Sequence, residues 1–465
     1  MRKKATYGGE SRDGSWWPHR RTYLNLIAGL GAALSGCARS GPLGSTQTDS
    51  TPEVLEGTQV RKLVPPEEHS AKRFGRSIAI TGAGGMAIVG SPYDDQPNGF
   101  RSGSAYVYER TANSWSQQTK ITPPDGGRND WFGSVVSVSD DGTTALFGAP
   151  FDEGGSEETD STDPGSAYVF EYTNGSWQQA SKLTGDNSEA TDRFGSNVAL
   201  SANGNTGVVS APRELTPGRR GAVYVYHPQG ESWTQQAKFT DEDESVNMFG
   251  KSVALSGDGT VTAVSAENVN TAGMTPKTGT RKPFRAGVVF VFERSDGAWE
   301  RQVKLTAPDG DKEDFLGQSV AVSNTGRTII AGAPQDEDPN GDYAGSAYVF
   351  ERSNNTWDHQ AKLTPSDGDT EDYFGGAVTV SGEGEVVVVG AGGNEDPNGT
   401  GAGSAYMFQR SNGSWEEQAK LTADDGDSED AFGAAVEVAS DGSAALVSAY
   451  MDEDSNGEGA AYIFD

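Results

Sequence analysis

A Phe-Gly pair that recurs along the chain constrains its fold more than any other feature. Six complete copies begin at Phe74, Phe132, Phe194, Phe249, Phe374 and Phe432, and a degenerate copy reads Leu316-Gly317. The glycines of successive copies are 55 to 67 residues apart, a length that suffices for one four-stranded blade. The sequence therefore predicts an all-β fold, a seven-bladed β-propeller of four-stranded antiparallel blades.

Each repeat contains four short apolar or alternating stretches that are bounded by turn residues. In the sixth repeat they read FGGAVTVSG, EVVVVGAG, GSAYMFQRS and SWEEQAKLT. The chain has 62 glycines, and no segment carries the apolar 3.6-residue stripe of a long amphipathic helix. A tryptophan opens the fourth stretch of six repeats, and we expect its ring to cover the neighbouring blade.

The two ends of the repeat array predict how the ring closes. The last repeat stops at GAAYIFD, its third strand, and residues 58–64, TQVRKLV, are similar to a fourth strand. We therefore expect an N-terminal strand to complete the last blade of a propeller that spans residues 58–465. A lysine recurs at one place in every fourth strand, where we expect it to protect an exposed sheet edge. These lysines are Lys62, Lys120, Lys182, Lys238, Lys304, Lys362 and Lys420.

Gly-Ala-Pro triplets accompany the Phe-Gly pairs, most clearly at residues 148–150 and 332–334. With these couplets, residues 58–465 resemble the FG-GAP repeats of the integrin α-subunit propeller and of its prokaryotic relatives. The resemblance implies the propeller fold. It leaves the function open, because one fold of this kind hosts many functions.

The first 57 residues read as an export signal followed by a tether. Arg20 and Arg21 resemble a twin-arginine (Tat) signal, and residues 34–37, LSGC, resemble the lipobox of a lipoprotein. Cys37 is the only cysteine and is the expected lipidation site, so residues 1–36 form the predicted signal peptide and residues 37–57 a flexible tether. The alternative is a short anchor that is never cleaved. The prediction is an exported protein that is lipid-anchored to the membrane on the outer face of the cell.

The charge of the chain excludes one class of partner. Its 67 acidic and 36 basic side chains give a formal net charge of −31. A nucleic-acid partner is not expected, because contact with phosphates requires the opposite sign. The acidic excess is typical of salt-loving organisms, here of an archaeal source, because it keeps a protein soluble when salt screens repulsion.

Three acidic loops between second and third strands predict possible calcium sites. Their oxygen side chains stand at positions one, three and five and are followed by glycine, the spacing at which ligands converge on a hard cation. The candidate ligands are Asp336, Asp338 and Asn340 in the first loop, Asp396 and Asn398 in the second, and Asp452, Asp454 and Asn456 in the third. The loops between blades add further aspartates to the same face.

The same loops can also be read as solvated turns. Ala347 stands at position twelve, where a calcium loop needs an acid, and Asp-Pro-Asn-Gly is a good type I turn. Integrin-type calcium loops, moreover, lie between first and second strands, where this chain has no ligand series. Both interpretations, a calcium site and an acidic turn, stay open at this point.

Two neighbouring repeats replace these acids with basic residues. The candidate partner-binding residues are Arg213, Arg219 and Arg220 in the third repeat, and Lys277, Arg281, Lys282 and Arg285 in the fourth. They are either a tolerated insertion or a docking site for an acidic protein or glycan.

Catalysis finds little support in the sequence, because the four histidines are scattered and the carboxylates are too numerous to single out a pair. We therefore expect a non-catalytic surface binding or adhesion module that recognises a protein or glycan through its loops. The alternatives are a carbohydrate-binding, lectin-like propeller and a surface hydrolase.

Overall fold

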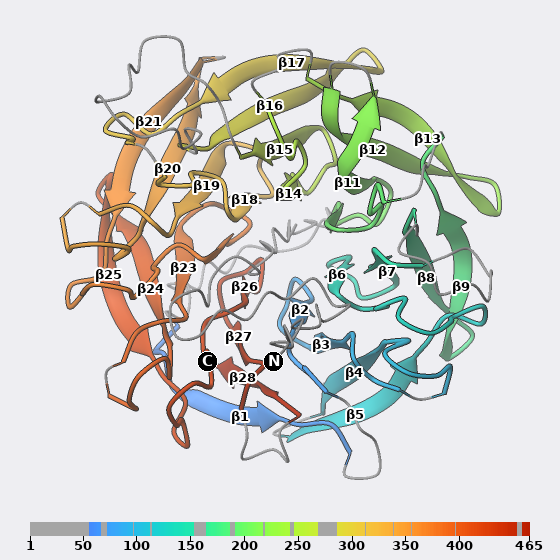
Figure 1. Ribbon diagram of the computed structural model, residues 1–465, viewed down its shortest axis with the longest axis horizontal. Helices are drawn as coiled ribbons and strands as arrows, with labels where there is room; N and C mark the ends of the chain where they lie inside the picture. Colours follow the sequence, from blue (N-terminus) through green and yellow to red (C-terminus); the bar gives the residue numbers. More distant parts are fainter. Residues whose placement is uncertain are drawn as a thin grey trace, which may run out of the picture.

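The computed structural model describes residues 55–66, 72–95, 97–111, 114–152, 164–186, 191–216, 219–241, 246–267, 286–311, 313–337, 339–354, 356–395, 397–452 and 458–465. These residues form seven four-stranded antiparallel sheets around a central axis (Figure 1). In this part of the chain no helix has the length and hydropathy that a membrane span requires. The predicted fold class is confirmed.

Each blade has four strands, which follow one another outward in sequence order except that β1 is the outer strand of the seventh blade. The innermost are β2 (Ser77–Ile80), β6 (Val135–Val138), β10 (Val198–Leu200), β14 (Val253–Leu255), β18 (Val320–Val322), β22 (Ala377–Val380) and β26 (Val436–Val438). The second are β3 (Met86–Ser91), β7 (Thr144–Ala149), β11 (Gly207–Thr216), β15 (Val261–Ala266), β19 (Thr328–Ala333), β23 (Val386–Ala391) and β27 (Ala445–Ala449).

The third strands are β4 (Ser104–Thr111), β8 (Ser166–Thr173), β12 (Arg219–Gln229), β16 (Val288–Ser295), β20 (Ser346–Ser353), β24 (Ser404–Ser411) and β28 (Ala460–Phe464). The outer strands are β5 (Ser114–Ile121), β9 (Ser176–Leu183), β13 (Ser232–Phe239), β17 (Ala298–Leu305), β21 (Thr356–Leu363), β25 (Ser414–Leu421) and β1 (Gln59–Leu63). The outer strands form the rim of the disc in Figure 1.

The ring closes through the N-terminal strand, as the sequence predicted. The seventh sheet has the order β1-β28-β27-β26, and in its register Lys62 lies opposite Tyr462 and Leu63 opposite Ala461. In Figure 1 the blue β1 lies beside the red β28. Joining the two ends of the chain in one sheet leaves the propeller without an open seam.

The hydrophobic core lies between adjacent blades rather than within one. One cluster joins Ile88 and Val107 of the first blade to Phe132 and Phe147 of the second, and Trp177 packs against it. The same pattern recurs around the ring. The predicted role of the tryptophans as covers of the neighbouring blade is confirmed.

The Phe-Gly pair is the point where one blade docks on the preceding one. Phe132 stacks on Phe147 with 4.9 Å between ring centroids, and its backbone forms a bridge with Gly103 of the first blade. Gly133 has a φ of +77°, and a Cβ atom there would lie 2.6 Å from the carbonyl oxygen of Ser104. Only glycine allows this approach, so the pair marks every repeat.

The turns between first and second strands form a closed ring of backbone hydrogen bonds. Each turn donates an N–H group to the turn of a neighbouring blade, as from Gly82 to the Asp140 carbonyl at 3.2 Å and from Asp140 to the Ala202 carbonyl at 3.0 Å. The ring ends where Asp441 donates to the Gly82 carbonyl at 3.1 Å. We call this side of the disc the turn face. The opposite side carries the connections from second to third strands and between blades, and we call it the loop face.

Candidate partner-binding face

A network of lysine, tyrosine and carboxylate side chains recurs on the loop face. In the fifth blade the Lys362 ammonium lies 2.8 Å from Asp309 and 2.9 Å from Asp336, while the Tyr348 hydroxyl donates to Asp336 at 2.6 Å. The side chain of Lys362 is about one fifth exposed, whereas Asp336 is buried. Burial lowers the pKa of Lys362, but the hydrogen bonds and charges of the two aspartates outweigh it, so the pKa is raised.

This network gives the recurring lysine a more specific contact than the edge protection that we expected. The seventh blade repeats it, since Lys62 lies 2.7 Å from both Asp425 and Asp452, and Tyr462 donates to Asp452 at 2.8 Å. The lysine compensates a carboxylate that would otherwise be buried without a counter-charge. In the fourth blade Phe290 replaces the tyrosine, and Lys304 is exposed and makes no ion pair within the described ranges.

Two of the predicted calcium ligands therefore lie in these networks. Asp336 and Asp452 stand at the first position of their loops, are 4% and 1% exposed, and face an ammonium and a phenol. In the second loop the equivalent Asn394 donates to Asp372 at 3.1 Å. A carboxylate that is already neutralised in this way is a poor calcium ligand.

The asparagine at the fifth loop position acts as a clip between loops. Asn398 donates its side-chain amide to the Ala423 carbonyl at 3.1 Å, and Asn340 reaches the Pro365 carbonyl at 3.5 Å. The Gly341 N–H donates to the Glu337 carbonyl at 2.9 Å, which closes the turn. These contacts agree with the interpretation of the loops as turns.

The remaining candidate ligands, Asp338, Asp396, Asp454 and Asn456, lie outside the described residues. Among the residues that are described, no group of three or more His, Cys, Asp or Glu side chains is placed to hold a metal ion. Calcium binding stays a prediction, and titration of calcium into the protein tests it.

Further carboxylates are buried just before the innermost strands. Asp314 and Asp430 accept hydrogen bonds from the backbone N–H groups of Asp311 and Asp427, at 2.5 and 2.7 Å. Burial raises the pKa of Asp314 to about 7 and that of Asp430 to about 6. Some of the carboxylates on this face therefore hold loops in place. They carry less negative charge than a formal count of acidic residues assigns to them.

The basic residues of the third blade lie on a hairpin rather than on a loose loop. β11 and β12 extend into this segment, where Thr216 pairs with Arg219 and Leu215 with Arg220 after a bulge. Arg213 lies on β11 and is exposed. The other predicted residues, Lys277, Arg281, Lys282 and Arg285, lie outside the described part of the chain.

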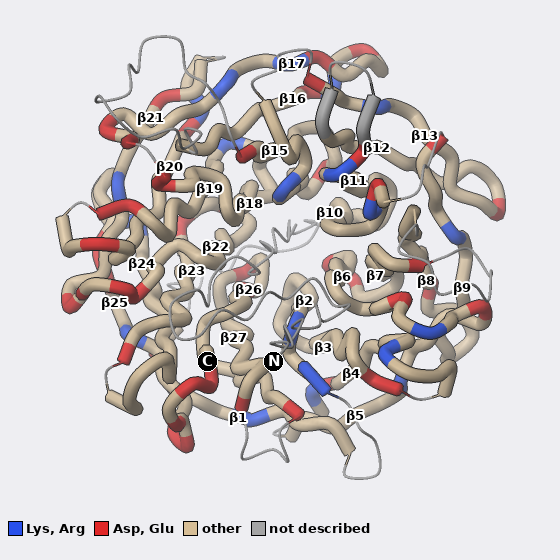
Figure 2. Tube along the Cα trace, viewed as in Figure 1, with Lys and Arg blue, Asp and Glu red and all other residues tan. Residues whose placement is uncertain are grey.

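In Figure 2 basic segments lie beside β2 and β11 near the centre of the disc, while acidic segments gather near the periphery around β24 and β25.

The structure adds a cluster of arginines and aromatic rings that the sequence did not single out. We call Arg73, Tyr93, Arg101, Trp131, Phe151 and Arg193 the arginine–aromatic cluster. Its members come from the loop-face ends of the first three blades, just before β2, β4, β6 and β10 and just after β3 and β7.

The cluster is a chain of stacked groups. The guanidinium carbons of Arg73 and Arg101 lie 4.7 and 4.4 Å from the centre of the Tyr93 ring. Tyr93 contacts Trp131 at 4.9 Å, and Trp131 contacts Phe151 at 4.2 Å between centroids. Arg193 covers Phe151 at 4.4 Å. Stacking of this kind holds planar guanidinium groups in fixed orientations.

One backbone position supplies half of the cluster. The residue before each Phe-Gly pair has a left-handed φ, which is 59° for Arg73, 58° for Trp131 and 56° for Arg193. The equivalent residues of the other blades are Met248, Phe315, Tyr373 and Ala431, with φ between 56° and 59°. The repeats thus share one strained conformation at a position where their side chains differ.

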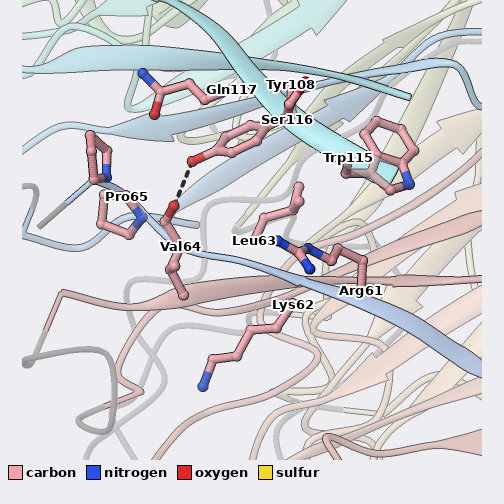
Figure 3. Close-up of a pocket in the computed structure, with 10 residues that line it drawn as sticks. Arg61, Lys62, Leu63, Val64, Pro65, Tyr108, Trp115, Ser116 and Gln117 are labelled. Atoms are coloured by element: carbon pink, nitrogen blue, oxygen red, sulfur yellow. Dashed lines mark hydrogen bonds between the residues drawn. The ribbon is translucent and has the colours of Figure 1, made fainter. Parts of the chain in front are cut away.

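The groove at the junction of the seventh and first blades offers fewer groups for recognition of a partner than the arginine–aromatic cluster does. It has a volume of about 360 Å³ and is lined by β1 and β5, with Trp115 and Tyr108 at its wall (Figure 3). The Tyr108 hydroxyl donates to the Val64 carbonyl at 2.7 Å, and Lys62 belongs to the network described above. The Tyr108 hydroxyl and the Lys62 ammonium are therefore engaged within the protein.

Comparison with protein families agrees with this architecture. The model of the FG-GAP repeat matches residues 58–108, 115–170, 177–226, 233–277, 299–350, 357–408 and 415–464. Each matched segment begins at the outer strand of one blade. Six of the seven end within the third strand of the next blade, and residues 233–277 end between its second and third strands, so the repeat is out of phase with the blade. No curated protein matches the chain significantly. With seven matched repeats across most of its length, the chain belongs to the FG-GAP repeat family.

Proposed function

We propose that this chain is an exported, lipid-anchored surface binding or adhesion module that recognises an acidic protein or glycan partner through its loop face. The FG-GAP propeller is a fold typical of binding modules and is usually non-catalytic. The proposal adds where the protein is located in the cell and what kind of partner it binds.

One observation carries the choice of face and partner. In a chain with a net charge of −31, the arginine–aromatic cluster gathers basic side chains near the centre of the loop face. Arg213, predicted as a partner-binding residue, is close enough to Arg193 for its charge to lower the pKa of that guanidinium. Loops on a rigid scaffold are the usual place of recognition, and the turn face is closed by its ring of hydrogen bonds.

The attachment to the membrane rests on sequence. Cys37 at the end of the lipobox-like segment is the proposed lipidation site, and residues 37–57 the proposed tether to the propeller. Such a tether would let either face of the disc reach a partner beyond the membrane surface.

A binding screen of the purified full chain against envelope proteins and surface glycans tests the proposal. Arg213→Glu is expected to weaken binding of the partner by at least about tenfold, since a charge-assisted contact is replaced by repulsion. Arg327→Glu is the matched control, because Arg327 is also exposed but lies in a turn between first and second strands. Equal affinity of both variants and the wild type would refute the choice of face. Several equivalent glycan sites per molecule would instead favour the lectin-like alternative.

A further inference from the structure

The arginines of the cluster form no ion pair with the carboxylates that the structure describes. Within the described ranges, no ion pair involves the side chains of Arg73, Arg101, Arg193 or Arg213, whereas Arg352 on β20 and Arg410 on β24 each pair with a glutamate at 2.8 Å. Burial and the neighbouring charge of Arg213 lower the pKa of Arg193 to about 10. The arginine stays charged at neutral pH and is held where an added anion would relieve repulsion.

Aromatic rings cover the faces of these guanidinium groups, so their N–H edges are the part that can contact a ligand. Their guanidinium carbons lie over the Tyr93 and Phe151 rings. Stacking of this kind uses the faces of a guanidinium group and leaves its N–H edges for hydrogen bonds. A guanidinium held in this way is preorganised for a two-point contact with a carboxylate. Little side-chain entropy is left to lose on binding.

The aromatic rings of the cluster are poorly placed to stack on a sugar. Trp131 lies between Tyr93 at 4.9 Å and Phe151 at 4.2 Å, and the latter two rings are covered by arginines. Tyr93 is only 8% exposed. Sugar recognition by aromatic stacking needs a free ring face, whereas recognition of carboxylates needs only the guanidinium edges.

We propose that the arginine–aromatic cluster, with Arg213 beside it, binds the carboxylates of an acidic polypeptide segment. The inference rests on the proposed function and narrows its partner from any acidic macromolecule to a protein segment. An extended segment rises about 3.3 Å per residue, so acidic side chains spaced along it can meet arginines of both the first and the third blade.

The acidic rim does not prevent such a contact. At about 0.15 M salt the Debye length is about 8 Å, so charges at the periphery of the disc are largely screened from a ligand at its centre. The rim carboxylates are also partly compensated, because Asp309 and Asp425 pair with Lys362 and Lys62. A direct guanidinium–carboxylate contact is screened much less.

Binding of poly-L-glutamate to the full chain at about 0.15 M salt tests the inference, with polygalacturonate as a carboxylate-bearing glycan in parallel. We expect poly-L-glutamate to bind, to bind more weakly as salt is raised, and to lose about tenfold in affinity for each arginine removed in Arg73→Gln and Arg193→Gln. The control variants Arg61→Gln and Arg327→Gln remove the same charge from exposed sites outside the cluster. Arg213→Gln provides a further variant at an exposed position that leaves the stacked rings untouched.

The outcomes separate this inference from the proposed function. Binding of polygalacturonate without poly-L-glutamate, or binding of poly-L-glutamate that the cluster variants leave unchanged, would overturn the inference while a surface binding module stands. No binding of either polymer overturns the inference as well, and the screen of envelope components then decides the function. Unchanged thermal unfolding of the variants shows that any lost affinity is not lost folding.

Discussion

At the scale of single residues, the structure separates side chains that recur from blade to blade from side chains that vary at a fixed backbone position. Lys362, Tyr348 and Asp336 form one unit, and the same unit recurs in the seventh blade. The residue before each Phe-Gly pair, in contrast, keeps its conformation and changes its side chain.

Removing one lysine should show what the network contributes. Lys362→Met leaves Asp336 buried without its ammonium partner, and we expect a loss of about 2–3 kcal/mol in the free energy of unfolding, measured by urea titration. Lys304→Met is the matched control, since Lys304 is exposed and makes no ion pair in the described part of the fourth blade. Its expected cost is below about 0.5 kcal/mol. Equal costs for both lysines would contradict the assigned role.

A buried glutamate next to the axis predicts a pH-dependent stability. Glu437 on β26 is 0% exposed, and its described hydrogen-bond partner is the Thr379 hydroxyl at 3.4 Å. Burial raises its pKa well above the usual 4.5. Below pH 4.5 the Glu437 side chain is protonated in both the folded and the unfolded chain. As the pH rises further, the unfolded chain loses the proton while the folded chain keeps it, which costs about 1.4 kcal/mol per pH unit up to the folded pKa.

Glu437→Gln should therefore melt at a higher temperature than the wild type at pH 7.5, and the difference should shrink toward pH 4.5. Glu385→Gln is the control, because Glu385 is exposed on the turn before β23. A stability difference that is the same at both pH values would show that Glu437 does not titrate as the structure implies.

At the scale of elements, β1 completes the seventh blade and thereby the ring. Leu63 on this strand is 2% exposed, while the next residue, Val64, is 43% exposed. Leu63→Ala is expected to cost about 2–4 kcal/mol, because it opens a cavity at the junction of the first and last blades. Val64→Ala should cost less than about 0.5 kcal/mol. Denaturant unfolding of both variants checks the contrast, and a similar small effect for both would argue against closure through β1.

The elements were largely predictable from the sequence, because seven repeats fix the number of blades and the incomplete last repeat fixes the closing strand. The lysine networks were not, because Lys362 and Asp309 are 53 residues apart and meet only when the outer strand of one blade returns over the preceding loop. Asp336 looked like the first ligand of a calcium loop for the same reason. The sequence shows the loop that contains Asp336, but it does not show that Lys362 pairs with this carboxylate.

At the scale of the whole molecule, the net charge of −31 conceals an uneven distribution over the disc. The sequence located basic residues in the third and fourth repeats, of which Arg213 is exposed on β11. It did not show the arginine–aromatic cluster, because Arg73 and Arg101 come from the first blade and Arg193 from the third, and only the propeller brings them together.

The proposed anchoring is also a property of the whole chain. Cys37→Ser should move the protein from the membrane fraction to the soluble fraction of cells that express it, because a lipid chain can no longer be attached. Replacing Ser35 by Ala, which leaves Cys37 in place, is the control. Retention of Cys37→Ser in the membrane fraction would point to the uncleaved anchor instead.

The central claim is that the centre of the loop face, over the first three blades, is the surface that binds the partner. Amide hydrogen exchange of the full chain with and without poly-L-glutamate and polygalacturonate tests it most directly. We predict slower exchange on addition of poly-L-glutamate in the segments around Arg73, Trp131 and Arg193, with no change in the turns around Gly82 and Gly382. Protection confined to the turn face or to the outer strands, with either polymer, would contradict the claim.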